Sequence, residues 1–349
     1  MVILNFPHEL LLMVAEYLSI GDLSKFRLTS REIWLVLTPR YEKLCLEDIG
    51  KLTALQWAAV RGYVELIELA ISKGAEINKP LGSNLEMTAP RMSDKPGAVC
   101  LLVNRTACLD DAKDALARTP LYLAACSGKV RAINVLLQAG ASMQCLGEID
   151  TPAHISASKG DVKSMQEFIN AGFDINTRGC GASTILHEAM QGGIKIVMYL
   201  LEHAGGERLV NAKDICHRTP LHLVARSFPV RYKRRAMTKL LLKHGADIHV
   251  RDRIGNTPAH LAAFPGDVDT MRVLIAAGID FHAPGAYGET ILHRAMQNRK
   301  GVLQYLLRQE GVKKIIHVKD NFAWTPLDHA KRLGVWEAMN RLVELSINN

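Results

Sequence analysis

The sequence predicts an all-α solenoid of short helix pairs, and three features support this fold class. One four-residue phrase returns about nine times at intervals close to 33 residues, each phrase has the composition of a helix start, and an apolar segment follows each one. A fixed period of this length is typical of stacked repeats, which present a long surface in place of one globular core. The fold class therefore favours a binding protein over an enzyme.

The first element of each repeat is a short helix that begins at a threonine. In Thr119-Pro120-Leu121, the Thr hydroxyl can cap a free N–H of the first turn and Pro suits the first helical position. A small pair such as Ala124-Ala125 allows neighbouring helices to approach closely, and Gly128 ends the helix. The nine phrases open at Thr53, Thr88, Thr119, Thr151, Thr184, Thr219, Thr257, Thr290 and Thr325.

The second element is another helix, with a turn after it. Val135, Leu136 and Leu137 supply the apolar positions of one such helix, and Gly140-Ala141 follows it. An aspartate recurs five residues before the next anchor threonine, at Asp48, Asp114, Asp214, Asp252 and Asp320.

These elements together resemble the ankyrin repeat, from about Asp48 to the C-terminus. The resemblance implies a β-turn and two antiparallel helices in each repeat, with the turns projecting as a row of fingers. The anchor threonines lie 35, 31, 32, 33, 35, 38, 33 and 35 residues apart, so the faint copy at Thr88 counts as a ninth, degraded repeat. Pro90 and Pro96 disfavour a regular helix in that copy, and we expect a distorted repeat between Gly82 and Gly97.

Residues 1–47 do not repeat and form a separate predicted domain before the repeat domain at 48–349. Residues 6–18 have apolar positions at helical spacing, Asp22 and Ser30 are suitable caps for two further short helices, and Pro39 ends the last one. Three short helices bury little surface by themselves, so a partner or the adjacent repeats must stabilise them.

This segment resembles the F-box, through residues 6–11, Val14 with Leu18, Asp22-Leu23, and 29–31 with Trp34. The resemblance implies docking on a Skp-type adaptor of a cullin–RING ubiquitin ligase. The adaptor contacts that it implies are Phe6, Pro7, Leu10, Leu11, Val14, Leu18, Leu23 and Leu28. The alternative interpretation is an N-terminal helical cap for the solenoid, because terminal repeats need atypical caps.

Composition narrows the function classes. The sequence has no stretch of about 18 apolar residues and therefore predicts no membrane span, and its start lacks the basic leader of a signal peptide. The seven cysteines are scattered and odd in number, which indicates reduced thiols in the cytoplasm or nucleus and no zinc cluster. The net charge of +8 is concentrated in the repeats, since residues 1–47 are acidic on balance, and favours either acidic partners or simply solubility.

The recurring histidines, at 154, 187, 222, 260 and 293, do not form a catalytic or metal site in this interpretation. One histidine per repeat places them about 10 Å apart along the stack, too far for shared coordination. The ankyrin resemblance implies instead that each one hydrogen-bonds the backbone near the turn. No phosphate loop, nucleophile elbow or dinucleotide fingerprint occurs, so we expect no enzyme and no cofactor.

Two regions are candidate binding surfaces. The late finger tips and first-helix ends carry large side chains, including Ile254, where the early ones carry Ser127, Gly147, Ser158, Gly181 and Gly192. The predicted client-binding residues are Arg218, Arg226, Arg253, Phe264, Tyr287, Phe322 and Trp324. Alternatively, Phe322 and Trp324 pack against the last repeat. The second region is the basic segment 226–235, expected as an inter-helix loop, which is either a docking or import signal or a plain solvated loop.

The sequence thus predicts a substrate receptor that recruits a client protein through its repeats to a Skp–cullin–F-box ubiquitin ligase. It is expected to be a monomer apart from the adaptor, with no nucleic-acid or membrane partner. One rival is a plain ankyrin-repeat scaffold with no ligase link. Another is a protein that binds the adaptor but acts outside the ligase.

Overall fold

The computed structural model describes residues 48–49, 52–72, 74–78, 118–144, 150–203, 205–226, 231–297 and 301–347. The predicted F-box segment, with all of its adaptor contacts, and the distorted copy between Gly82 and Gly97 lie outside the described residues.

The described part of the chain contains eight antiparallel helix pairs, as the repeat pattern predicts. The pairs are α4 (Ala54–Arg61) with α5 (Val64–Ser72), α7 (Pro120–Cys126) with α8 (Val130–Gln138), α9 (Pro152–Lys159) with α10 (Val162–Asn170), α11 (Ile185–Gly192) with α12 (Ile194–His203), α13 (Pro220–Arg226) with α14 (Arg231–Lys243), α15 (Pro258–Ala263) with α16 (Val268–Ala276), α17 (Ile291–Met296) with α18 (Val302–Leu306), and α20 (Pro326–Leu333) with α21 (Trp336–Ile347). A short helix, α19 (Glu310–Lys313), and three 3-10 turns, η2 (Cys180–Ala182), η3 (Gly206–Leu209) and η4 (Ala286–Gly288), complete the helical elements.

The chain divides into two compact units, of which the first comprises residues 1–156 and 163–173. Two two-residue strands, β1 (Asp48–Ile49) and β2 (Leu52–Thr53), pair antiparallel just before α4. Helix α4 packs on α7, and α5 packs on α8. Bonds between repeats join Asn134 Nδ2 to Glu167 Oε2 over 2.6 Å and the Ser142 N–H to Asn78 Oδ1 over 2.8 Å.

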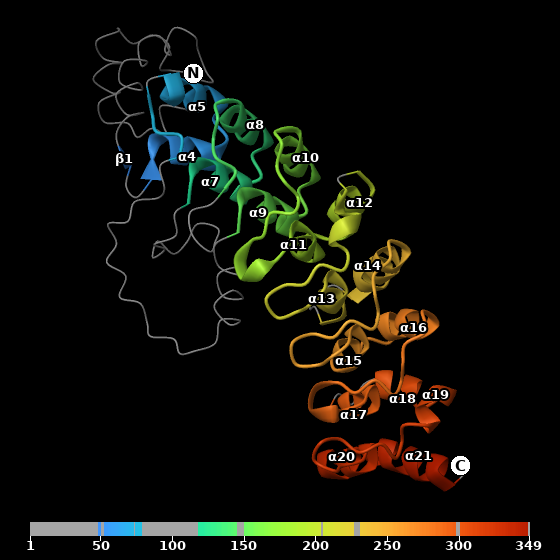
Figure 1. The fold of residues 1–349 in the computed structure, drawn as a ribbon. Coiled ribbons are helices and arrows are strands. Elements are labelled where there is room, and N and C mark those ends of the chain that lie inside the picture. Colours follow the sequence, from blue (N-terminus) through green and yellow to red (C-terminus); the bar gives the residue numbers. More distant parts are fainter. Residues whose placement is uncertain are drawn as a thin grey trace, which may run out of the picture. The chain divides into compact units, whose positions relative to one another are not determined.

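The second unit comprises residues 157–162 and 174–349 and carries the candidate surface. Its first helices, α11, α13, α15, α17 and α20, form one layer, and its second helices, α12, α14, α16, α18 and α21, form the other (Figure 1). The loops between repeats project on the side of the first helices as fingers (Figure 1). The apolar side chains between the layers, such as Leu200, Leu241 and Leu274, are buried and form the core.

The helix starts have the predicted chemistry. The Thr119 hydroxyl accepts a hydrogen bond from the Tyr122 N–H, and Pro120 occupies the first helical position. The Thr184 and Thr325 hydroxyls cap α11 and α20 in the same way. Because the cap satisfies an N–H that the helix leaves free, each six- to eight-residue first helix begins at a defined residue.

The basic segment differs from the prediction of an inter-helix loop. Arg226 is the last residue of α13, and Arg231 already begins α14. Helix α14 has 13 residues where α16 has 9, so most of the extra length in this repeat lengthens the helix. Arg234 is buried and lies 2.9 Å from Asp267 on α16, whereas Arg235 is exposed. At least Arg234 therefore belongs to the core and not to a solvated loop.

Candidate protein-binding surface

Three fingers of the second unit are shaped by a carboxylate at the base of the finger. Asp214 Oδ1 accepts the N–H groups of Cys216 and Arg218 at 2.9 and 2.8 Å. Asp252 binds the N–H groups of Ile254 and Asn256 in the same way, and Asp320 binds those of Phe322 and Trp324. The recurring aspartate is therefore a structural cap for the turn, and its charge is directed inward, toward the backbone.

A histidine joins each finger to the helix of the preceding repeat. In His260, Nδ1 accepts the Thr257 N–H at 3.3 Å, and Nε2 lies 3.1 Å from the carbonyl oxygen of Glu289 in the next finger. The same pair of contacts occurs at His187, His222 and His293, whose Nε2 atoms reach the carbonyls of Arg218, Asn256 and Trp324 at 2.9, 3.2 and 3.1 Å. The prediction that the recurring histidines bind the turn backbone is confirmed for these four of the five, and it stays a prediction for His154.

Burial keeps these imidazoles neutral. Desolvation lowers the pKa of His260 to about 4, although the hydrogen bond to the Glu289 carbonyl partly opposes it. Desolvation also lowers the pKa of His187, His222 and His293. A neutral ring with Nδ1 as acceptor and Nε2–H as donor fits both contacts, so the histidines act as fixed hydrogen-bonding links between repeats.

The fingers also bind one another through the backbone. The Ile215 N–H donates to the Gly181 carbonyl at 2.8 Å, the Arg253 N–H to the Cys216 carbonyl at 2.8 Å, and the Asn321 N–H to the Tyr287 carbonyl at 2.9 Å. These bonds fix the spacing of neighbouring tips. The row of fingers is consequently a rigid frame, which limits the entropy that a bound partner would have to remove.

A row of large apolar side chains projects from this frame. Ile215, Ile254, Tyr287 and Phe322 occupy the tips of successive fingers and are 54%, 65%, 65% and 64% exposed. The rings of Tyr287 and Phe322 lie 6.1 Å apart. We call these four residues the tip row. Aromatic side chains held in water on a rigid frame are typical of protein-binding surfaces.

Arginines stack on the aromatic side chains beside the tip row. The Arg294 guanidinium lies 5.3 Å from the centre of the exposed Phe264 ring, at the end of α15. The Arg332 guanidinium lies 4.7 Å from the Trp324 ring. Stacking restricts both partners and presents a flat, positively charged face next to apolar side chains.

The structure leaves most of the predicted client-binding residues exposed, with two differences. Arg253, Tyr287 and Phe322 are exposed in the fingers, and Arg226 and Phe264 are exposed at the ends of α13 and α15. Arg218 is instead a structural residue, because its guanidinium pairs with Asp214 at 2.7 Å in its own finger.

Trp324 is the second difference. It is half-buried against α20, 5.4 Å from the His329 ring. The alternative that Phe322 and Trp324 pack against the last repeat therefore holds for Trp324 and not for Phe322. Sequence analysis missed Ile215, a single isoleucine in a polar loop, and Arg332, a single exposed arginine on α20, because neither gives a periodic signal.

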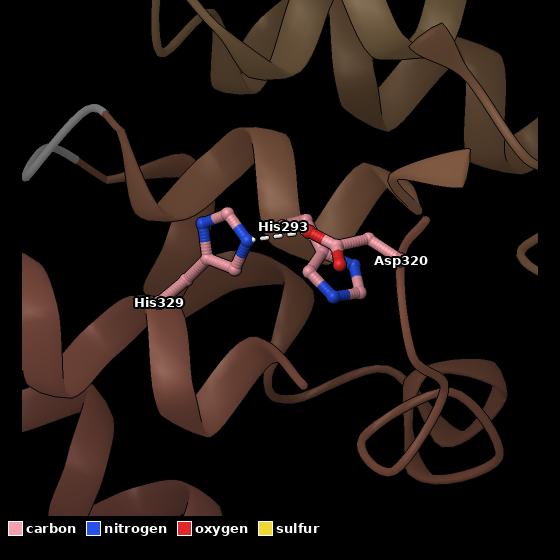
Figure 2. Close-up of side chains that lie close together, drawn as sticks. All are labelled: His293, Asp320 and His329. Atoms are coloured by element: carbon pink, nitrogen blue, oxygen red, sulfur yellow. Dashed lines mark hydrogen bonds and ion pairs between the residues drawn. The ribbon is translucent and has the colours of Figure 1, made fainter. Parts of the chain in front are cut away.

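Among the described residues, one group of three side chains has the composition of a metal site. Ligand atoms of His293, Asp320 and His329 lie within 4.8 Å of one another (Figure 2). Each atom already has a structural partner. His293 Nε2 binds the Trp324 carbonyl, Asp320 Oδ1 caps the last finger, and Asp320 Oδ2 lies 2.8 Å from His329 Nε2. The group is thus the histidine link of this repeat, with an added hydrogen bond between His329 and Asp320.

The fold and surface define a repeat scaffold with a protein-binding face. Matches to the ankyrin-repeat family cover residues 118–147 and, in three overlapping copies, 153–252, 207–284 and 230–320. The chain belongs to the ankyrin-repeat proteins. No F-box match covers residues 1–47, and no helix among the described residues is long and apolar enough to cross a membrane.

Several known proteins are similar over the repeats. The transient receptor potential cation channel subfamily A member 1 of Drosophila melanogaster is 29% identical in an alignment of 244 positions, which covers 65% of this chain and 20% of the channel. The match to its human counterpart is 24% identical and covers 87% of this chain and 31% of the channel. The chain thus spans about a fifth to a third of these relatives. The ankyrin repeat domain of human ASB11 has a TM-score of 0.53 at 21% identity, covering 74% of this chain and 98% of that domain, and shows the fold alone.

Proposed function

We propose that this chain is a non-catalytic scaffold that binds a partner protein on the tip row and the adjoining first-helix ends of the second unit. The observation that carries the proposal is the tip row itself, four successive fingers that each expose a large apolar side chain. Covering such side chains releases water, and aromatic anchors of this kind typically contribute about 2 kcal/mol or more each to binding.

The local backbone at Tyr287 supports the same conclusion. Tyr287 has φ 58° and ψ 23°, a left-handed conformation that costs a non-glycine residue about 1–2 kcal/mol. The ring gains little from the interior in return, because it is mostly exposed. Ala182, His217 and Ala323 have a similar positive φ in their fingers, so the left-handed turn belongs to the finger itself, and it is the exposure of the Tyr287 ring on this turn that favours a role in binding.

The test compares tip variants with matched surface variants. A photo-crosslinking amino acid at 254 or 287 should capture a partner in cells, whereas the same group at the exposed Met198 of α12 should not. The captured partner is then made recombinantly, and calorimetry with the full chain should show that Ile254→Ser/Tyr287→Ser weakens binding at least thirtyfold. Equal binding by that variant and by Met198→Ser would rule out the tip row as the docking face.

A second candidate function is recruitment of the bound client to a ubiquitin ligase through residues 1–47. The ordered apolar residues Pro7, Leu10, Leu11, Val14 and Leu18 support it, because they match the F-box pattern in order and spacing. In this proposal the N-terminal segment binds a Skp-type adaptor while the repeats hold the client, which raises the local concentration of client beside the ubiquitin-loaded enzyme.

Calorimetry with a recombinant Skp-type adaptor separates this proposal from a plain scaffold. Leu10→Ala/Leu11→Ala in the full chain should abolish adaptor binding and leave client binding unchanged. If the unaltered chain does not bind the adaptor, the ligase function fails and the scaffold function stands. If it binds the adaptor but no ubiquitin reaches a bound client, the chain acts on the adaptor outside the ligase.

A further inference from the structure

The charge of the second unit is strongly unbalanced. Residues 174–349 contain 25 Lys and Arg against 16 Asp and Glu, a net charge of +9. The placement of these charges matters more than their sum, because carboxylates that are buried in the fingers present little negative charge to a partner.

On the finger side, three carboxylates bind groups of the protein itself. Asp214 and Asp320 are buried and accept backbone N–H groups, as described above. Glu289 is buried too and lies 3.3 Å from the Arg294 guanidinium. These three carboxylates therefore present little negative charge to a partner.

The basic side chains on the same side remain exposed. Arg253 stands directly before Ile254 in the tip row, and among the described side chains no carboxylate pairs with it. Arg332 is exposed and rests on Trp324, two residues after Phe322. An arginine thus lies near each end of the row of tips from 254 to 322, and a partner there meets apolar side chains that are flanked by positive charges.

We infer that the tip row binds an extended acidic segment of a partner protein that carries an apolar side chain at about every third residue. This inference rests on the proposed function and specifies the chemistry of the partner. Packed helices are about 8–10 Å apart, which sets the spacing of successive repeats. A polyproline II chain advances about 3.1 Å per residue and returns to the same face every third residue, or about every 9 Å. Its apolar side chains therefore match successive tips.

The tip row favours a peptide over a nucleic acid. Single-stranded nucleic acids bind basic grooves through bases that stack on aromatic rings. Two of the four tips are Ile215 and Ile254, which offer aliphatic contact and no stacking surface. Acidic side chains between apolar residues would instead meet Arg253 and Arg332, at a surface where charge pairs set association rate and specificity.

The experiment is a selection of displayed random 12-residue peptides on the immobilised full chain, with counter-selection on Ile254→Ser/Tyr287→Ser/Phe322→Ser. Circular dichroism checks that the variant is folded, and Ile254→Ser alone replaces it if it is not. We expect the recovered peptides to be enriched in Asp and Glu and to carry apolar residues at intervals of three.

Binding of a recovered peptide should then weaken with added salt and fall roughly fivefold to tenfold in Arg253→Gln/Arg332→Gln. Lys195→Gln/Lys239→Gln is the charge-matched control, because both lysines are exposed on second helices, and it should leave affinity unchanged.

Three results would overturn the inference. If the recovered peptides need the tip row but are not enriched in Asp and Glu, the proposed function stands and the acidic character of the partner is wrong. Recovery of no tip-dependent peptide would count against the proposed function as well. Displacement of the peptide by polyuridine RNA at lower concentrations than by a poly-glutamate peptide would point to nucleic acid as the ligand.

Discussion

Tyr287 and Gly181 have the same left-handed backbone conformation at the equivalent position of their fingers. Tyr287 has φ 58° and ψ 23°, and Gly181 has φ 61° and ψ 29°. Each lies three residues before an anchor threonine, inside a finger closed by a backbone bond, Gly285 N to Glu289 O or Gly179 N to Ser183 O. The same turn geometry thus holds a glycine in an early finger and an exposed tyrosine in a late finger.

This relationship predicts the response of Tyr287 to substitution. Tyr287→Gly removes the steric strain that any side chain has there, so it should be more stable than Tyr287→Ala by about 0.5–1 kcal/mol in urea unfolding. Phe322 is the control, because its backbone does not have a positive φ. At Phe322 the order should reverse, with the Gly variant less stable than the Ala variant. If the Gly and Ala variants had the same order of stability at both positions, the backbone at Tyr287 would not be strained.

Close backbone contact inside the second unit leads to a prediction at Gly192. A Cβ atom there would lie 2.1 Å from the Ala157 carbonyl oxygen, a contact with backbone that no side-chain rotation relieves. Gly192→Ala should therefore destabilise the protein by about 2 kcal/mol or more. Gln191→Ala, at the exposed neighbouring position of α11, should change stability by less than about 0.5 kcal/mol. Thermal unfolding by circular dichroism distinguishes them.

Most of the repeat architecture follows from local sequence, and the surface does not. Thr119-Pro120 marks a helix start because the cap and the proline act within one turn, so their effect is visible in the residues themselves. Asp214 and His260 belong to an aspartate and a histidine that recur with the repeat period, and each binds a backbone group of a finger. The same periodicity identified the late tips as candidate anchors, since side-chain size there departs from the early repeats.

Other features depend on contacts that no period encodes. Arg234 lies in a run of basic residues that suggests a solvated segment, yet a helical start places it against Asp267, 33 positions further along the chain. Arg218 has the composition of an interface anchor but pairs with Asp214 inside its own turn. Trp324 packs against α20 because it directly precedes the N-cap Thr325, which places its ring beside His329 in that helix. Each difference arises from a specific pairing of a charge or ring, over a long sequence distance for Arg234 and within a few residues for Arg218 and Trp324.

The Arg234–Asp267 pair predicts unequal effects in neighbouring arginines. Arg234→Ala leaves the buried Asp267 carboxylate without its cation and should destabilise the protein by about 3–5 kcal/mol. Arg235→Ala removes an exposed charge and should change stability by less than about 0.5 kcal/mol. Arg234→Met/Asp267→Asn should recover part of the loss, because Asn retains the cap on α16 while the buried charge is gone. Equal effects of the two single variants in urea unfolding would contradict the buried pair.

The histidine links predict that stability falls in mild acid. The pKa of His260 is about 4 in the folded protein, below the ordinary 6.5, because burial disfavours the imidazolium. Between these values the unfolded chain binds more protons than the folded one, so the free energy of unfolding decreases as pH falls from about 6.5 to about 4. His260 alone accounts for on the order of 3 kcal/mol over that window, and the lowered pKa values of His187, His222 and His293 act in the same direction.

Urea unfolding at several pH values tests this link between repeats. His260→Gln removes the titrating group, so its stability should depend less steeply on pH than that of the unaltered chain, although it is lower at pH 7 because the bond to the Glu289 carbonyl is weakened. His249→Gln is the control, since His249 is exposed, and it should retain the full dependence. If His260→Gln keeps the same slope between pH 6.5 and 4, protonation of His260 does not limit the stability of the stack, and the slope in that window must come from the other buried histidines, His187, His222 and His293.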